Sequence, residues 1–165
     1  MSTLRRLTRN DLPRLRQFWI EHWGGEEMIT HGNVYRPEQL DGFVVEDGQE
    51  WIGLITFVIK DKECEVASLD SLHAGQGIGT MLIEKAAAEA RAKNCNRLFL
   101  ITTNDNLHAL GFYQKRGFEL VAVHRGAVNQ TRKIKPDIPL VGNHGIPLRD
   151  EIELEMSLRG VSLSR

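Results

Sequence analysis

The sequence has few cysteines, no excess of either charge and no long apolar segment. Its two cysteines, Cys64 and Cys95, lack the close spacing of a metal or redox motif. The 21 Lys and Arg residues nearly balance the 22 Asp and Glu residues, which argues against a dedicated nucleic-acid partner. No apolar run approaches the ~18 residues of a membrane-spanning helix, and the polar, basic N-terminus argues against a secretory signal. We expect a cytoplasmic protein with two free thiols and no membrane partner.

The chain needs neither disulfides nor a metal ion to fold. At roughly 100–200 residues per domain, its 165 residues predict a single domain, residues 1–165, that is large enough to bury a core. None of the six histidines stands four positions from another on a helix, so nothing resembles a zinc site. We therefore expect no metal.

The first half of the chain predicts a helix followed by antiparallel strands. Leu12, Leu15 and Trp19 recur at helical spacing, so Asp11 to Trp23 is expected to form an amphipathic helix. Turn dipeptides then separate segments that are rich in β-branched and aromatic residues. The expected strands are Thr3–Leu7, Gly42–Glu46, Trp51–Ile59 and Glu65–Leu72, with loop and short helix from Glu26 to Leu40.

The second half alternates helices and strands around an irregular excursion. Apolar residues recur every four positions from Ile78 to Ala90, which predicts a helix over Gly77 to Lys93. Ala127 to Arg149 carries Pro136, Pro139 and Pro147, and long irregular loops inside compact domains are often functional. The remaining expected elements are a buried strand at Leu98–Ile101, a helix at Asn106–Arg116, and strands at Phe118–His124 and Ile152–Met156.

The string Gly75-Gln76-Gly77-Ile78-Gly79 lies between an expected strand and an expected helix. The first N–H groups of a helix lack partners inside it, the aligned peptide dipoles favour an anion there, and glycines let a phosphate approach the backbone. The turn therefore predicts a phosphate site, although a tight turn with glycines for packing is the alternative. It is not a P-loop, which ends in Gly-Lys-Ser/Thr, and Thr80 stands where the dinucleotide fingerprint requires its third glycine.

A second motif makes the pattern specific. The motif is defined by Asn106, Ala109, Tyr113 and the pair Gly117-Phe118. This spacing resembles the fourth-helix motif of the GNAT superfamily of N-acetyltransferases, and the glycine turn resembles that family's pyrophosphate motif. The two motifs occur in the family's order, and the resemblance covers essentially the whole chain. Ala74 departs from it, because the family carries Gln or Arg at that position.

The resemblance implies an α/β (α+β) fold with a twisted, mostly antiparallel central sheet flanked by helices. The fourth and fifth strands of such a sheet splay apart, and the pantetheine arm of acetyl-CoA lies in the gap. Acetyl-CoA is thus the implied co-substrate. The implied cofactor-binding residues are Leu69, Ser71, Leu72, Gly75, Gln76, Gly77, Ile78, Gly79, Thr80, Asn106, Ala109 and Tyr113.

Acetyl transfer to an amine requires both a base and an acid. A lysine-like amine has a pKa of ~10.4 and is mainly protonated near neutral pH, while the departing thiolate needs a proton. The resemblance assigns the acid to Tyr113. We take Glu65 as the base, and strand alternation puts Asp70 on the opposite face. A backbone N–H at a strand irregularity near Leu69 to Ser71 is expected to polarise the acetyl oxygen.

The acceptor site is the part that the sequence constrains least. The resemblance puts it in Trp23–Arg36 and Ala127–Arg149. His124 and His144, near this region, are further candidate bases. We expect a small-molecule or peptide amine as acceptor, and edge strands such as Ile152–Met156 could pair in a homodimer. The leading hypothesis is an acetyl-CoA-dependent N-acetyltransferase. The alternatives are a catalytically weak acetyl-CoA-binding sensor and a scaffold that binds no CoA, since fold alone does not settle function.

Overall fold

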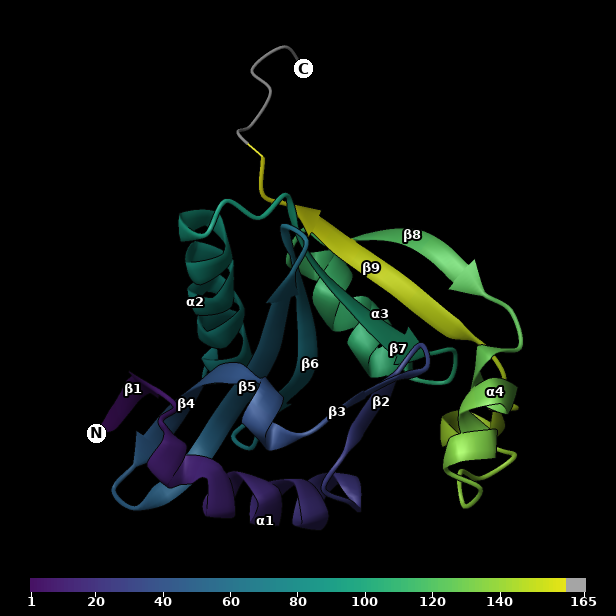
Figure 1. Ribbon diagram of the computed structural model, residues 1–165, viewed down its shortest axis with the longest axis horizontal. Helices are drawn as coiled ribbons and strands as arrows, with labels where there is room; N and C mark the ends of the chain where they lie inside the picture. The colour runs from purple at the N-terminus through teal and green to yellow at the C-terminus, as the bar shows by residue number, and fades with distance from the viewer. Residues whose placement is uncertain (160–165) are drawn as a thin grey trace. The chain divides into compact units, whose positions relative to one another are not determined.

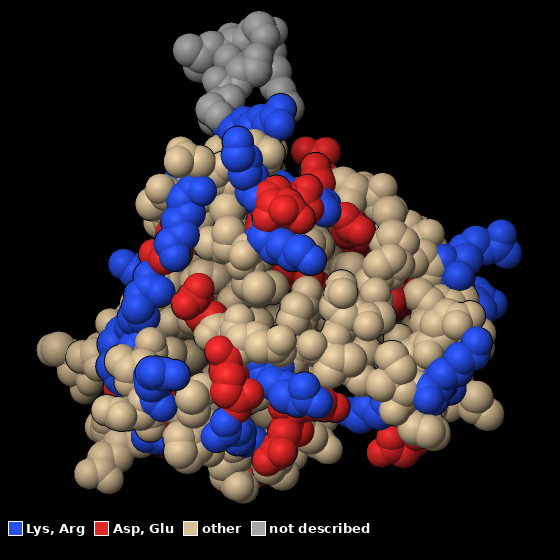
Figure 2. Space-filling view, in the orientation of Figure 1, with Lys and Arg blue, Asp and Glu red and all other residues tan. Residues whose placement is uncertain are grey.

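A computed structural model describes residues 1–159 (Figure 1). The chain forms two compact units. The first unit contains Met1–Met28, Val34–Leu98 and residues 157–159, and the second contains Ile29–Asn33 and Phe99–Met156. Both units combine strands with helices, as the mixed α/β pattern predicts. Lys and Arg side chains are interspersed with Asp and Glu on the face drawn in Figure 2.

The first unit contains an antiparallel series of four strands. In spatial order these are β1 (Ser2–Arg6), β4 (Asp41–Asp47), β5 (Glu50–Lys60) and β6 (Glu63–Ser71). Tight turns join the last three, with Gly48 at φ +63° in the first turn and Asp61 and Lys62 at positive φ in the second. The expected antiparallel meander is confirmed.

Two helices cover opposite faces of these strands. Helix α1 (Leu12–Trp23) ends at Gly24, which is left-handed at φ +79°, and it packs Phe18 and Trp19 in a core cluster with Leu54 of β5. Helix α2 (Ile78–Ala92) packs its apolar stripe against Gly53, the residue next to Leu54 in β5. Successive residues of a strand point to opposite faces, so the two helices sandwich β5.

Strand β6 contains a β-bulge. Its pairing with β5 joins Ser68 to Thr56 but Val66 to Phe57, so Ala67 is an extra residue in the ladder. A bulge of this kind shifts the alternation of side chains along the strand. The irregularity therefore lies two residues before Leu69, near the segment Leu69 to Ser71 as expected.

The segment after α1 forms a small hairpin where loop and short helix were expected. Strands β2 (Met28–Thr30) and β3 (Asn33–Tyr35) pair as a two-stranded sheet. Short 3-10 turns lie at Arg9–Asp11 and Pro37–Gln39. Each hairpin strand is only three residues long, which is too short to produce a readable alternation in the sequence.

The second unit contains the strand order β7 (Arg97–Thr103), β9 (Glu151–Ser157), β8 (Glu119–His124). Figure 1 shows β8 beside β9, and the two pair antiparallel with a bulge at Val121. Helix α3 (Leu107–Lys115) connects β7 to β8. Because β9 has a strand on each side, the expected homodimer edge at Ile152–Met156 is wrong. Strand pairing between two copies would use β8 at the edge of this unit instead.

The excursion from Ala127 to Arg149 is not irregular throughout. It opens with helix α4 (Ala127–Ile134), which begins after left-handed Gly126 and buries Val128 and Thr131. The helix faces the loop that follows it, because the guanidinium of Arg132 donates to three loop carbonyls. These are the carbonyls of Ile138, Pro139 and Leu148, at 3.2, 2.7 and 2.6 Å. A 3-10 turn at Asn143–Gly145 completes the excursion.

Within residues 1–159, no helix is both long and apolar enough to cross a membrane. The expected splay of the fourth and fifth strands of the sheet involves strands of different units, so it stays a prediction.

The close approach of α2 to β5 predicts the effect of a single methyl group. A Cβ atom added at Gly53 would lie 2.4 Å from Cγ2 of Ile78 and 3.2 Å from Cδ1 of Leu82. We expect Gly53→Ala to lower the free energy of unfolding by about 1–3 kcal/mol through overpacking, and Tm by about 2–4 °C per kcal/mol. Gly111→Ala in α3, where a Cβ meets nothing within 4 Å, is the control and should leave Tm unchanged or higher. An unchanged Tm for Gly53→Ala would contradict this packing.

Candidate functional site

The residues predicted to form the site occur in both units. The end of β6 and the glycine turn belong to the first unit, together with Glu65. Asn106, Ala109 and Tyr113 belong to the second.

The glycine turn is exposed and has the backbone that glycine permits. Gly75 and Gly77 are left-handed, with φ of +80° and +71°. A Cβ at either position would meet nothing within 4 Å, so backbone conformation rather than packing requires glycine here. Gly77 is the N-cap of α2, a helix of 15 residues, whose first N–H groups have no carbonyl partner inside the helix. The turn is therefore an open cradle for an anion, and Ala74 is exposed beside it.

The end of β6 leads directly into this turn. Leu69 pairs with Ile55 and Ser71 with Gly53. The ladder continues one step further, because the N–H of Leu72 donates to the carbonyl of Ile52 at 2.9 Å. The Leu72 side chain is 41% exposed. This apolar side chain therefore stands in solvent next to the glycines.

Glu65 is buried in β6 and has a phenol as a partner. The hydroxyl of Tyr35, at the end of β3, donates to Oε1 of Glu65 at 2.7 Å. Burial raises the pKa of Tyr35, and the hydrogen bond to Glu65 raises it further, so the phenol stays protonated as the donor. The predicted base is thus held in a defined orientation by a residue 30 positions away in the sequence.

Asp70 lies on the same face of β6 as Glu65, contrary to the expectation from simple alternation. Glu65 pairs with Val58 and Asp70 with Leu54, which share one face of β5. The bulge at Ala67 supplies the extra residue that changes the alternation.

The indole of Trp23 donates to Oδ2 of Asp70 at 3.1 Å. Burial raises the pKa of this carboxyl, opposed by the Trp23 hydrogen bond and by the nearby His22. Between Asp70 and Glu65 on the same face, the hydroxyls of Ser68 and Thr56 are 2.6 Å apart. One face of the first unit therefore carries a polar row.

In the second unit, the fourth-helix motif begins with a helix cap. The Oδ1 atom of Asn106 accepts from the N–H of Ala109 at 3.2 Å, and its Nδ2 donates to Oγ1 of Thr102 at 3.1 Å. The Asn-to-Ala spacing of the motif is thus an N-cap interaction. Tyr113 is buried further along α3, with its ring edge-on to Phe112 and to Phe118 at centroid distances of 5.3 and 5.2 Å.

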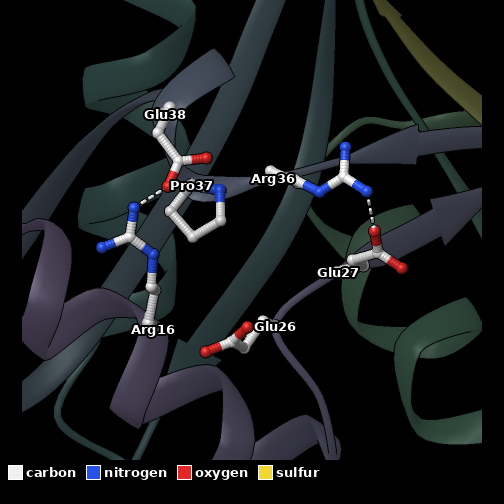
Figure 3. A pocket seen from close by; sticks show the side chains of 6 residues that line it. All are labelled: Arg16, Glu26, Glu27, Arg36, Pro37 and Glu38. Atoms are coloured by element: carbon white, nitrogen blue, oxygen red, sulfur yellow. Dashed lines mark hydrogen bonds and ion pairs between the residues drawn. The ribbon is translucent and has the colours of Figure 1, made fainter.

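A charged cavity of about 350 Å³ lies in the first unit, near the segment expected to bind the acceptor. Figure 3 shows two ion pairs across it, Arg16 with Glu38 and Arg36 with Glu27, the second at 2.5 Å. Glu26 lies between the pairs. The cavity has three carboxylates against two guanidinium groups, so its lining favours a cation.

The sequence pattern missed the partners of the acidic residues. Tyr35 lies in the segment expected to bind the acceptor, and its bond to Glu65 joins segments that no local signal connects. His31 also contacts His124, with ring centroids 4.1 Å apart in the second unit. The alternation of apolar and acidic residues along Ile152–Met156 was the one signal that carboxylates share a face there.

Comparison with known proteins identifies the fold. Residues 6–118 match the model of the acetyltransferase (GNAT) family. The uncharacterized protein YxbD of Bacillus subtilis (strain 168) is 44% identical over 143 residues, which are 86% of this chain and 90% of YxbD.

Solved structures of acetyltransferases are similar over nearly the full length. An IAA acetyltransferase from Bacillus cereus has a TM-score of 0.67 at 20% identity, covering 95% of this chain and 99% of that one. A GNAT family acetyltransferase from Elizabethkingia anophelis with acetyl-CoA bound has a TM-score of 0.65 at 21% identity, covering 94% and 97%. With a family match over more than half of its length, the chain belongs to the GNAT family of acetyltransferases.

Proposed function

We propose that the protein transfers an acetyl group from acetyl-CoA to a primary amine of a small molecule or peptide, by direct attack of the amine on the thioester. The open left-handed turn at Gly75 and Gly77 carries this proposal, because it leaves a helix N-terminus free for the pyrophosphate. The proposed domain spans residues 1–165. It holds the cofactor through Leu69, Ser71, Leu72, Gly75, Gln76, Gly77, Ile78, Gly79, Thr80, Asn106, Ala109 and Tyr113.

In this mechanism Glu65 accepts a proton from the attacking nitrogen and Tyr113 donates one to the departing thiolate. A phenol with a pKa near ~10 can protonate a thiolate whose conjugate acid has a pKa near ~8.5. The burial of Glu65 and its bond to Tyr35 support the first role, because a fixed carboxylate needs no reorientation to accept the proton. A backbone N–H beside the bulge at Ala67 is the proposed donor to the acetyl oxygen.

The acceptor is proposed to be basic. The cavity of Figure 3 carries one more carboxylate than guanidinium, which suits an acceptor with a cationic group. We place the protein in the cytoplasm. In support, Cys64 and Cys95 are both buried free thiols, and burial raises the pKa of Cys64 to about 12, which keeps that thiol unreactive.

Charge placed at Ala74 tests the pyrophosphate site. Ala74→Arg should tighten acetyl-CoA binding and Ala74→Glu should weaken it. A unit charge at ~4 Å in water contributes about 1 kcal/mol, or about fivefold in Kd. Titration calorimetry at low and high salt measures both effects, which salt should reduce. The same two substitutions at Ala88 are the control, because this residue is exposed on α2 about 15 Å from the start of the helix. Equal effects at the two positions would argue against an anion at the turn.

Removal of the Tyr113 hydroxyl tests the acid. We expect Tyr113→Phe to lower kcat by about 10²-fold or more and to change the Kd of acetyl-CoA far less, because proton transfer to the thiolate is lost and the ring packing is kept. Release of CoA thiol measures turnover. Full activity in the variant would refute the assignment, and it would leave Tyr113 as a packing residue of α3.

Neutralising Glu65 tests the base. Glu65→Gln should lower kcat by about 10²–10⁴-fold, since an amide cannot accept the proton. The matched control is Glu50→Gln, an exposed carboxylate on the neighbouring strand β5, which should keep full activity. Tyr35→Phe leaves the carboxylate in place and should reduce kcat less than Glu65→Gln does. If the Glu65 and Glu50 variants behaved alike, another group would have to accept the proton.

A further inference from the structure

The proposed reaction releases two protons from the acceptor nitrogen, and Glu65 accounts for one of them. The ammonium must first lose a proton to become a nucleophile, and the nitrogen loses a second when the amide forms. Tyr113 supplies one proton to the thiolate, so one proton is released overall. We propose that His124, oriented by Glu153, takes the first proton from the ammonium of the bound acceptor. This inference rests on the proposed function.

His124 and Glu153 form an imidazole–carboxylate pair within the second unit. His124 ends β8, and its Nε2 lies 2.9 Å from Oε1 of Glu153 on β9. The bulge at Val121 sets this register, because it pairs Ala122 with Glu153 and His124 with Glu151. Both carboxylates of β9 thus share the face of the histidine. The His124 side chain is 25% exposed and that of Glu153 is 15% exposed, so solvent reaches both in part and the ring somewhat more than the carboxylate.

The pairing determines which ring nitrogen accepts a proton. A carboxylate accepts hydrogen bonds, so it holds the proton of a neutral imidazole on Nε2. The other nitrogen, Nδ1, then carries a lone pair. When Nδ1 takes a proton, the resulting imidazolium faces a negative charge that is already in place, as in catalytic triads of other enzymes.

A second histidine and a second carboxylate complete the cluster. The ring of His31, in the turn between β2 and β3, lies 4.1 Å from that of His124. Its Nδ1 is 3.6 Å from Oε1 of Glu151, and its backbone N–H donates to Oε2 at 3.2 Å. The side chain of Glu151 is 6% exposed, and its Oε1 has no hydrogen-bond partner. One imidazole and two carboxylates therefore lie on the face of His124, and the carboxylates attract an ammonium ion.

The cluster also lies where two acceptor segments meet. His31 belongs to the segment Trp23–Arg36, while His124 and Glu151 flank the excursion Ala127–Arg149. The N–H of Asn104 donates to the carbonyl of Asp150 at 2.9 Å. This bond joins the residue before β9 to the chain two residues before Asn106, the N-cap of α3. Within residues 1–159, no three His, Cys, Asp or Glu side chains are arranged to hold a metal ion.

The step is a simple transfer. One N–H bond of the ammonium breaks, a bond from that proton to Nδ1 of His124 forms, and the electron pair stays on the amine nitrogen. The neutral amine then attacks the thioester carbon. The imidazolium returns its proton to solvent, to which the ring is partly exposed.

The test uses His124→Gln, which keeps an amide donor for Glu153 and cannot accept a proton. With an α-amine acceptor of pKa ~8, about nine-tenths of the amine is protonated at pH 7 and about one-tenth at pH 9. Because the variant can use only the amine that is already neutral, we expect kcat/KM to fall about tenfold at pH 7 and to stay nearly unchanged at pH 9. With an alkylamine of pKa ~10.4 the loss should persist at pH 9. The loss in Glu65→Gln should be the same at both pH values.

Glu153→Gln keeps the ring and provides the second variant, with a smaller loss at pH 7 that also shrinks at pH 9. His22→Gln, an exposed histidine on α1, is the control and should match the wild type. The melting shift with acetyl-CoA checks the fold of each variant. Equal losses at both pH values, or none, would overturn the role of His124 while leaving the proposed function intact. A wild-type protein that binds acetyl-CoA and acetylates no amine would instead overturn the proposed function, and this step with it.

Discussion

The polar row of the first unit, which runs from Glu65 to Asp70, depends on one extra residue in the ladder between β5 and β6. With Ala67 bulged, Glu65 and Asp70 point to the same side of the sheet, where Tyr35 and Trp23 donate to them. Without the bulge one carboxylate would lie under α2 among apolar side chains, at a cost of several kcal/mol for an unpaired buried charge. The bulge therefore allows two carboxylates on a largely buried strand to have polar partners.

Local patterns predicted most of the fold. The helices over Asp11–Trp23 and Gly77–Lys93 and the meander of β4, β5 and β6 occur within a few residues of their expected bounds, because long periodic segments and turn dipeptides are local signals. The glycine turn was also readable, since its positive φ angles require glycine. For the site, the pattern located Glu65 on the strand before this turn. The roles of Glu65 and of Tyr113 stay predictions.

What the sequence did not indicate depends on contacts between distant residues. A bulge has no composition of its own, so strand alternation put Asp70 on the wrong face. The central position of β9 follows from its pairing with strands on both sides, whereas its alternating acidic residues resemble those of an exposed edge. Helix α4 was hidden by the prolines that follow it, and Arg132 holds it against its own loop through carbonyls that no local pattern reveals.

The partial exposure of Trp23 has an optical consequence. Of the three tryptophans, Trp19 and Trp51 are buried at 0% and 3% exposure, whereas Trp23 is 44% exposed and its indole is bonded to Asp70. A dissolved quencher will therefore reach Trp23 first, and the red edge of the emission spectrum will come mainly from this ring. The protein thus carries an intrinsic fluorophore at one end of its polar row, hydrogen-bonded to a carboxylate that changes charge with pH.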